Sequence, residues 1–290
     1  MINLPCIFLA NVGVNASHSG LGLKSPRFPD GSFEFVTIPE RPALQKRVAT
    51  LEQPDGLVRY RDLTCFNWPG QPLTDFLPSR THHLPTHYDP EFAHFTYGDE
   101  GSRAGRAAAL KTLCPGDWLF FLARLTDYDL TAHKFLDTAG FYLVGFLEIE
   151  TIVADVRVPL DATTAQIFGH NAHLRRAQAW PELFYDGFYV FKGSVRSRRF
   201  QYAYPFGRAQ AELLLRDRHD QEWQWKAERS DLQTIGSYTR TCRCVLDPQT
   251  NQAHATRALA WLELSRNLLE EDFGLRELSR PTGLYNAKVS

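Results

Sequence analysis

The sequence predicts a mixed α/β fold of the α+β type, in which flanking helices and long irregular loops surround a central sheet. Segments rich in aromatic and β-branched residues fill the middle third of the chain, which favours strands that pair non-locally. The helical patterns are short, and stretches rich in Pro, Gly and Ser separate the elements. We expect one domain over residues 1–290, with a barrel-like core around residues 100–210 and a strand-plus-helix C-terminal part at residues 217–270.

The composition argues against several classes of protein. A formal net charge of −1 is unlike that of a protein that coats nucleic acid, so any nucleic-acid contact should be local. The five cysteines are scattered, which favours a reducing compartment, and we interpret Cys242 and Cys244 as strand residues. The first residues lack the basic region of a signal peptide, and no run of about eighteen apolar residues occurs. We therefore expect a cytoplasmic protein with no membrane partner.

The elements in the first part of the chain follow from local patterns. An apolar run closed by glycine predicts a buried strand at residues 4–13, and an irregular loop follows at residues 15–31. Alternation predicts a short strand at residues 32–38. Residues 54–87 are rich in proline and should form a long irregular excursion, of the kind that often carries function. Alanines after an N-cap serine predict a helix at residues 102–113.

The second part of the chain contains the strongest strand signals. A Cys-Pro-Gly-Asp turn leads into the apolar strand WLFFLARL, and GFYLVGFLEIE begins another long strand. The remaining predictions are helices at residues 161–176, 208–216 and 253–269, and an alternating strand at residues 221–226.

The pairing of these central strands has a recognisable shape. A glycine-aspartate turn opens the first strand, a polar crossing follows at residues 126–137, and the glycine-rich aromatic strand returns. This arrangement resembles the small barrel of the PUA, ASCH and EVE superfamily. The resemblance implies a PUA-like β-barrel and a ligand such as RNA, a nucleotide or a modified base.

The segment at residues 187–210 combines cations with aromatic rings. It holds five basic residues, seven aromatic residues and no acidic residue. Arginine forks match phosphate oxygens, and aromatic faces stack on bases, so Arg196, Ser197, Arg198 and Arg199 form a candidate anion-binding turn. Two structural alternatives stay open: the rings fill a sheet core, and the arginines form a solvated turn with weak salt bridges.

A group of histidines and carboxylates occupies residues 82–99. His87 and Asp89 are two positions apart, and on an extended segment they lie on the same face. The pair, with Asp99, suits acid/base catalysis or orientation of a ligand, and it also suits part of a divalent metal site. The alternative is that Asp89 and Asp99 only begin turns. The other histidines of the group are His82, His83 and His94.

Two further polar groups are candidates for ligand binding. Asn171 offers a donor and an acceptor to a base edge, with His173 beside it, although the same residues fit a helix terminus. Asn11, Asn15 and His18 follow the first strand, where mixed folds often bind ligands. The chain lacks the GxGxxG, GxxxxGK[ST], GxSxG and HExxH motifs, so common nucleotide-fold, hydrolase and zinc-protease assignments have no support.

Taken in order, seven motifs resemble a known family. They are ANVGVN with SPRFPDGSFEFVTIPE, HYDPEFAHFTYGD, GDWLFFLARL, GFYLVGFLEIE, NAHLRR, VFKGSVRSRRFQYAYPF and SYTRTCRCVLD. They are similar to the nucleotide-modification-associated domain of the third type, over roughly residues 3 to 250. The resemblance implies association with systems that make or handle modified DNA bases, and it leaves the reaction open. Many such domains have an aspartate where this chain has Asn15, which weakens a base or metal role there.

The family's polar signature implies a set of site residues that overlaps the candidates above. In this sequence the signature falls on Asn11, Asn15, His87, Asp89, Tyr97, Asp99, Asn171, His173, Ser197 and Arg198.

These observations predict a protein that binds a nucleotide or a DNA base, with DNA or a nucleotide as its main partner and other proteins of a modification or defence system as further partners. Arg196, Arg198 and Arg199 would contact phosphate, and Tyr202 or Tyr204 would stack on the base. Two alternatives remain: an enzyme acting on the base through the His/Asp group, and a protein-interaction module. No cofactor is identified beyond the divalent metal that the His/Asp spacing allows.

Overall fold

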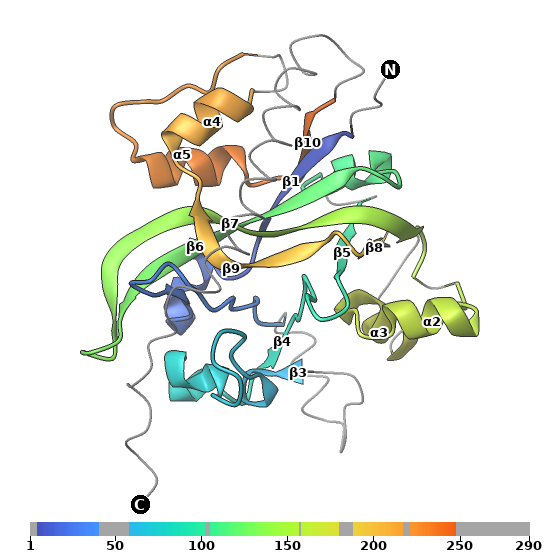
Figure 1. Ribbon diagram of the computed structural model, residues 1–290, viewed down its shortest axis with the longest axis horizontal. Helices are drawn as coiled ribbons and strands as arrows, with labels where there is room; N and C mark the ends of the chain where they lie inside the picture. The colour runs from blue at the N-terminus through green and yellow to red at the C-terminus, as the bar shows by residue number, and fades with distance from the viewer. Residues whose placement is uncertain are drawn as a thin grey trace, which may run out of the picture.

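A computed structural model describes residues 5–40, 58–101, 105–156, 158–179, 188–216 and 221–247. The fold is mixed α/β, as predicted: a curled sheet dominates, and a few short helices flank it (Figure 1). The helix predicted at residues 253–269 lies outside the described residues.

The described elements are mostly strands. The strands are β1 (Ile7–Val12), β2 (Ser25–Arg27), β3 (Val58–Arg59), β4 (Pro85–Thr86), β5 (Thr96–Glu100), β6 (Trp118–Asp129), β7 (Lys134–Val153), β8 (Phe188–Gly193), β9 (Arg198–Pro205) and β10 (Arg243–Leu246). The α-helices are α2 (Ala162–Phe168), α3 (Ala172–Ala179), α4 (Arg208–Leu214) and α5 (Asp231–Tyr238). The 3₁₀ helices of the described part are Ala16–Leu21, Tyr60–Asp62, Leu73–Phe76, Ser79–Thr81 and Ala108–Thr112.

The main sheet has the order β10-β1-β6-β7-β8-β5. Strand β1 runs parallel to β6 and antiparallel to β10, whereas β6 and β7 form a long antiparallel hairpin. Strand β7 is long enough to pair with β9 along one part and with β8 further on, and its register shifts in both pairings. These bulges bend the strand, and the sheet curls around its apolar face (Figure 1).

Aromatic side chains are buried on both faces of this sheet, since Phe8 pairs with Leu119 whereas the next residue of β6, Phe120, pairs with Phe146. Phe8, Phe120 and Phe146 have at most 1% of their surface exposed, and they belong to the largest cluster of buried residues. Tyr97 of the edge strand β5 packs on Phe121 of β6, with ring centroids 5.2 Å apart. This contact brings the edge strand across to the centre of the sheet, as in a half-barrel.

Two smaller cores lie outside the sheet. Helices α2 and α3 pack against β8, where Phe168 and Leu174 meet Val190. Residues 58–86 fold into short turns that bury Tyr60 and Phe76 in a second cluster, which they share with Phe28 and with Tyr128 of β6. The excursion predicted over residues 54–87 is therefore irregular in its described part, yet packed.

Several sequence predictions for the central strands are confirmed. The buried strand predicted at residues 4–13 is β1, and the two apolar segments of the middle third are β6 and β7. Cys244 lies within β10, and Cys242 immediately precedes it. The polar crossing predicted at residues 126–137 is wrong, because β6 and β7 continue through it and only residues 130–133 turn.

Four other predictions of local structure need correction. Residues 221–226 form no strand; Trp223 is buried and stacks on Tyr238 of α5, so tertiary packing explains the alternation. The helix predicted at residues 161–176 is two helices, divided at residues 169–171. The one predicted at residues 102–113 is, in its described part, the short 3₁₀ helix Ala108–Thr112. Residues 32–38 make only isolated bridges.

Among the described residues, no helix combines the length and the apolar character that a membrane crossing requires.

Candidate functional site

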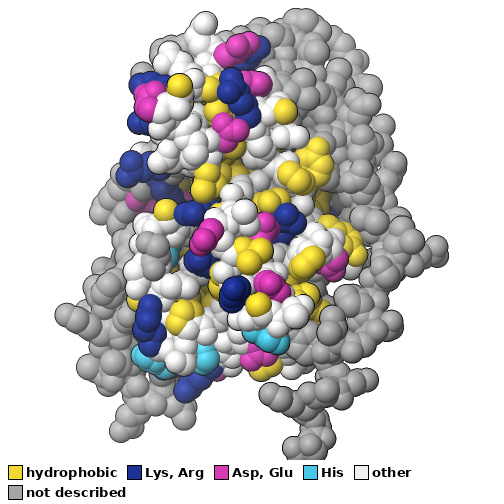
Figure 2. Space-filling model, turned by 90° about the vertical axis from the view of Figure 1, so that its left-hand side faces the viewer, with side chains coloured by type: hydrophobic (Ala, Val, Ile, Leu, Met, Phe, Trp, Pro, Cys, Tyr) yellow, Lys and Arg dark blue, Asp and Glu magenta, His cyan; other side chains and the backbone are white. Residues whose placement is uncertain are grey.

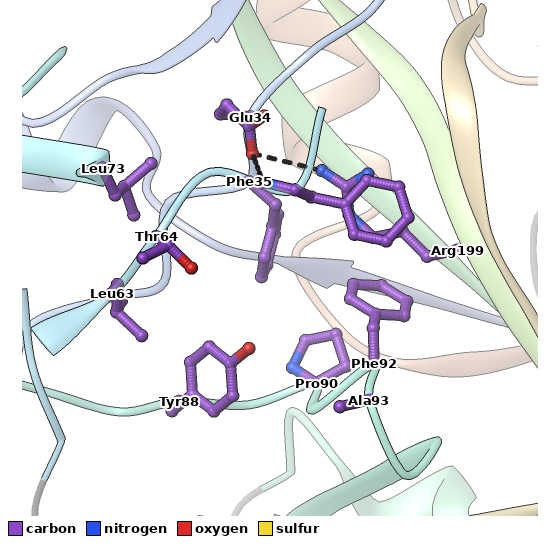
Figure 3. A pocket seen from close by; sticks show the side chains of 11 residues that line it. Glu34, Phe35, Leu63, Thr64, Leu73, Tyr88, Pro90, Phe92, Ala93 and Arg199 are labelled. Carbon is purple, nitrogen blue, oxygen red and sulfur yellow. Dashed lines mark hydrogen bonds and ion pairs between the residues drawn. The ribbon is translucent and has the colours of Figure 1, made fainter. Parts of the chain in front are cut away.

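Residues 87–93 carry two different surfaces on one short segment. His87 and Asp89 face the start of α3, whereas Tyr88, Pro90 and Phe92 line a cavity (Figure 3). The segment is irregular: the backbone N–H of Asp89 donates to the carbonyl oxygen of His87 at 2.7 Å, and the chain bends at residue 90 and turns from residue 92. The two surfaces therefore arise from this local bending and from tertiary packing. We call the two regions the polar cluster and the aromatic cavity.

The polar cluster is centred on the carboxylate of Asp89, which is buried. Its Oδ2 lies 3.5 Å from Nε2 of His173 and 3.9 Å from Nε2 of His87. The backbone N–H of Gly98 donates to the carboxylate at 3.0 Å, and Asn171 Nδ2 donates to Oδ1 at 3.2 Å. These contacts bring together four of the residues that the sequence analysis singled out, namely His87, Asp89, Asn171 and His173.

Helix α3 places His173 in this cluster. Asn171 immediately precedes the helix, and its Oδ1 accepts the backbone N–H of His173 at 2.9 Å. Its amide nitrogen also donates to Thr96 Oγ1 at 3.3 Å. Asn171 is fully buried, so its side chain orients Asp89 and begins the helix within the protein.

Gly98 provides the space that the His173 ring occupies. A Cβ atom at this position would lie 2.6 Å from Cδ2 of His173 and 3.1 Å from the carbonyl oxygen of Tyr189. Because a ring atom and a backbone atom are the nearest neighbours, neither moves easily. The glycine therefore permits the close approach of α3 to β5.

Glu40 and Arg176 complete the polar cluster, and the sequence did not single them out for it. The Arg176 guanidinium contacts both Glu40 Oε1 and His87 Nδ1, and Glu40 Oε1 lies 3.8 Å from the same His87 nitrogen. Burial raises the pKa of Asp89 well above its ordinary value, and the charge of Asp99 adds to this, while Gly98, Arg176 and Asn171 act in the opposite direction.

The aromatic cavity has a volume of about 160 Å³. Figure 3 shows side chains from separate segments around this common space. The lining residues are Glu34, Phe35, Leu63, Thr64, Phe66, Leu73, Tyr88, Pro90, Phe92, Ala93 and Arg199. Burial raises the pKa of Tyr88, so its hydroxyl remains a hydrogen-bond donor at neutral pH.

Arg199 and Glu34 form a buried ion pair in the cavity wall, 3.5 Å apart (Figure 3). The guanidinium lies 3.7 Å from the centroid of the Phe66 ring and 4.5 Å from that of Phe33. Burial raises the pKa of Glu34, although Arg199 and the N–H groups of Phe66 and Asn67 pull it down. The pair therefore fixes the 66–67 loop at the cavity mouth.

The arginine turn, residues 194–199, is occupied mainly by contacts within the protein. Arg196 pairs with Glu148, and Arg198 donates to the carbonyl oxygens of Val195 and Ser197. Ser197 is fully buried, and its Oγ accepts the backbone N–H of Glu148 at 3.1 Å. In this geometry the turn holds β9 to β7.

Tyr97 and Asp99 lie on the opposite face of β5 from the His173 ring. The Tyr97 hydroxyl donates to Asp99 Oδ2 at 3.2 Å, and Arg106 lies 3.8 Å from the same carboxylate oxygen. Burial raises the pKa of Tyr97 well above its ordinary value, with Asp99 adding to the shift. Asp99 therefore does not share a surface with His87 and His173.

Asn11, near the end of β1, and two residues that follow the strand form a third polar group. Asn11 Nδ2 donates to Thr239 Oγ1 at 3.0 Å, and the backbone N–H of Asn15 donates to His18 Nδ1 at 3.1 Å. Burial lowers the pKa of His18, and the charge of Arg106 lowers it further. None of the described contacts joins this group to the aromatic cavity.

Sequence reasoning missed most of the cavity. Tyr88, Pro90 and Phe92 follow the same two-residue alternation that linked His87 to Asp89, so the signal was present in HYDPEF. No local pattern marks Glu34 or Phe66, which reach the cavity only through tertiary structure. Tyr202 and Tyr204, predicted to stack on a base, lie on β9 outside the cavity lining.

The remaining histidines of the predicted group are not in the polar cluster. His94 bonds Glu91 and stacks on the ring of His170, 3.9 Å between centroids. His82 contacts the carbonyl oxygen of Leu77, and His83 is exposed. Of the described residues, only His87, Asp89 and His173 form a group of three or more with the spacing of a metal site.

Comparison with known proteins identifies the family. The sequence model described as nucleotide modification associated domain 3 matches residues 7–252, which include every group described above. No curated protein and no solved structure matches the chain. The curled sheet, the polar cluster and the aromatic cavity all lie within the matched region, and the chain belongs to the nucleotide modification associated domain 3 family.

Proposed function

We propose that this protein binds a nucleobase, in a free nucleotide or in an unpaired strand, as part of a nucleotide-modification system. The setting comes from the family to which the chain belongs. The observation that carries the proposal is the aromatic cavity, which combines ring walls with a small number of polar groups.

The size of the cavity suits one planar ring. Its volume is about 160 Å³. A cavity of about 150 Å³ admits benzene, while drug-sized ligands need roughly 300–1,000 Å³. Phe35, Tyr88 and Phe92 supply apolar faces around the space (Figure 3). A single base with its sugar directed toward solvent satisfies these limits.

Polar groups at the cavity wall match the edge of a base. The hydroxyls of Thr64 and Tyr88 each donate and accept hydrogen bonds, as the amide-like groups of a base require. The Arg199 guanidinium donates to the carbonyl oxygens of Phe33 and Phe200, at 3.1 and 3.3 Å. Arg199 is thus held by Glu34 and by these carbonyl oxygens and supports the Phe66 ring, whereas the hydroxyls select the base.

Phe66 lies at the cavity mouth and has an exposed fraction of 53%. Stacking of a base on an aromatic ring is worth about 1–3 kcal/mol. Because a base inside a duplex cannot reach such a ring, the ligand must be a nucleotide, a single strand or a flipped base. The exposed ring is the point of first contact in this proposal.

The face of the molecule seen in Figure 2 favours a short ligand over a long strand. On the face seen in Figure 2, basic and acidic side chains of the described part are interspersed, without a broad patch of one sign. A long strand binds through many phosphate contacts, which need such a patch. We keep Arg196 and Arg198 as phosphate contacts, with Arg196 exchanging Glu148 for the ligand. We also propose that the curled sheet is related to the PUA barrel, a fold whose members bind bases.

The test is a thermal-shift and calorimetric titration with the common deoxynucleotides, their 5-substituted forms and short single strands. A ligand of the folded state raises the unfolding temperature by mass action. Phe66→Ala should weaken binding about 5- to 150-fold, the equivalent of 1–3 kcal/mol. Leu136→Ala, another exposed apolar side chain, is the matched control and should leave binding unchanged. Equal affinities for wild type and Phe66→Ala would contradict the proposal.

A second candidate is an enzyme that acts on the bound base. The observation that favours it is the polar cluster, which approaches the cavity through the shared segment 87–93. In that case His87→Gln should abolish conversion of the base and leave the affinity for nucleotides unchanged. Nucleoside mass spectrometry of treated oligonucleotides measures the conversion. An unchanged nucleoside profile with the wild-type protein would exclude this candidate for the substrates supplied.

A further inference from the structure

We infer that His87, Asp89 and His173 form a binding site for a divalent first-row transition-metal ion. This site is separate from the nucleobase cavity, so either proposal can fail while the other stands. The inference rests on the positions of three ligand atoms and on the groups that orient them.

The three side chains converge on a common point. Their ligand atoms all lie within 4.8 Å of one another, and both Nε2 atoms face the same carboxylate oxygen, at 3.5 and 3.9 Å. Metal–ligand bonds of about 2.1 Å in a tetrahedral arrangement separate ligand atoms by roughly 3.4 Å. Small movements of the His87 side chain therefore close the site.

The histidine rings are arranged for coordination. Their centroids are 4.5 Å apart with planes at 88°, and each ring presents Nε2 to Asp89 Oδ2. Two imidazoles and one carboxylate suit zinc or iron, whereas magnesium and calcium prefer oxygen ligands. The ligand set therefore defines the class of ion.

Asp89 is held in place by neighbours that are not ligands. Asn171 Nδ2 donates to Oδ1, and the backbone N–H of Gly98 donates to Oδ2 at 3.0 Å; both bonds hold the carboxylate with Oδ2 beside the two histidines. Metal sites commonly orient their ligands through an outer layer of hydrogen bonds of this kind. The buried amide of Asn171 would thus orient Asp89 for coordination of the ion.

Glu40 supplies the outer partner of His87. When Nε2 coordinates an ion, Nδ1 carries the proton, and Glu40 Oε1 lies 3.8 Å from that nitrogen. The Arg176 guanidinium, which contacts both groups, then retains Glu40 as its partner. Binding of the ion therefore replaces the contact between Arg176 and His87 by one between His87 and Glu40.

The charges of the pocket favour a cation. Asp89 and Glu40 are buried carboxylates, and Arg176 pairs with Glu40. Buried carboxylates need compensation, and a divalent ion supplies it. Three protein ligands leave a coordination position for water or another small ligand. The His87 side chain is 14% exposed and provides the route of entry.

The experiment is a titration of chelator-treated, full-length protein with Co²⁺, followed by competition with Zn²⁺. Cobalt reports histidine coordination through visible ligand-field bands, and we expect saturation at one ion per chain. His87→Gln should weaken binding about 100-fold, at least as much as the loss of an outer-layer partner. His94→Gln is the control, because it removes a neighbouring exposed histidine that contacts Glu91 and His170 instead.

Glu40→Gln separates a positioning role from direct coordination. It should weaken binding about 10-fold while the cobalt bands persist, since the three ligands remain. Circular dichroism of each variant verifies folding. The inference is overturned if cobalt gives no ligand-field bands with wild-type protein, or if wild type and His87→Gln bind with equal affinity. Neither readout involves a nucleotide.

Discussion

The arginine turn and the 87–93 segment differ in how they use their polar side chains. The turn has the higher density of charge in the sequence, yet Arg196 and Arg198 bond to Glu148 and to backbone carbonyls. The 87–93 segment has fewer charges, and its alternation directs histidine and aspartate to one side and aromatic rings to a cavity.

The difference shows that alternation is more informative than charge density in this chain. A cluster of arginines next to a strand finds partners within the fold, because buried glutamates and free carbonyls lie close by. In the 87–93 segment, polar and aromatic residues alternate in the sequence, and the bent backbone directs them to two environments. Four predictions test how far this difference extends.

The largest effect is expected from Arg199→Ala, which removes the partner of buried Glu34. Loss of one member of a buried pair costs about 3–5 kcal/mol, and we expect the lower end, because burial already raises the pKa of Glu34 and protonation relieves the charge. Arg198→Ala should stay within about 0.5 kcal/mol. Chemical denaturation measures both. Equal effects would mean that the two arginines do not differ in structural role.

Gly98→Ala should destabilise the fold by about 1–3 kcal/mol, since its Cβ would overlap the His173 ring. The same change displaces His173 from Asp89 and should weaken cobalt binding. Gly105→Ala, where a Cβ meets no atom within 4 Å, is the control for denaturation. A Gly98→Ala protein as stable as wild type would show that α3 is free to shift.

Tyr88→Phe should weaken nucleotide binding about 5-fold, the equivalent of about 1 kcal/mol for one hydrogen bond, with little change in stability. Tyr202→Phe removes a hydroxyl from β9 outside the cavity and serves as control. Calorimetry with the best nucleotide from the panel gives both affinities. If Tyr202→Phe has the larger effect, the base lies against β9.

The smallest effect concerns His18. Burial holds its pKa below the ordinary value of 6.5, so below that pH the unfolded chain binds the proton more readily than the folded protein. Stability should therefore decrease as pH falls from 6.5 toward the lowered pKa of the folded state. His18→Asn should reduce this slope, and His83→Asn, at an exposed position, should not. If the stability of wild type and of His18→Asn changed equally with pH, the lowered pKa of His18 would be contradicted.

The sequence predicted the elements whose patterns are local and strong. Strands β6 and β7 were found because long apolar alternating runs admit few other structures. The false strand at residues 221–226 arose because Trp223 and Trp225 alternate with polar residues, although Trp223 packs on helix α5, which was not predicted. A local alternating pattern cannot distinguish a strand from an irregular segment that packs against a helix.

The candidate site was predictable in part for the same reason. His87 and Asp89 were linked by spacing, and the structure adds His173 and Asn171, both of them sequence candidates. Glu40 and Phe66 were not predictable, because their roles depend on contacts between segments far apart in the chain. Nothing in the local sequence around a residue indicates that it will make such a long-range contact.

The most direct test of the central claim is photo-crosslinking with a nucleotide or short strand that carries 5-iodouracil, followed by peptide mapping. The reactive base attaches to an aromatic ring that it touches, so the adduct reports where the base lies. We predict attachment at Tyr88, Phe92 or Phe66, suppressed by an excess of unmodified nucleotide. Competed attachment at the arginine turn or on β9, with none in the cavity, would contradict the account.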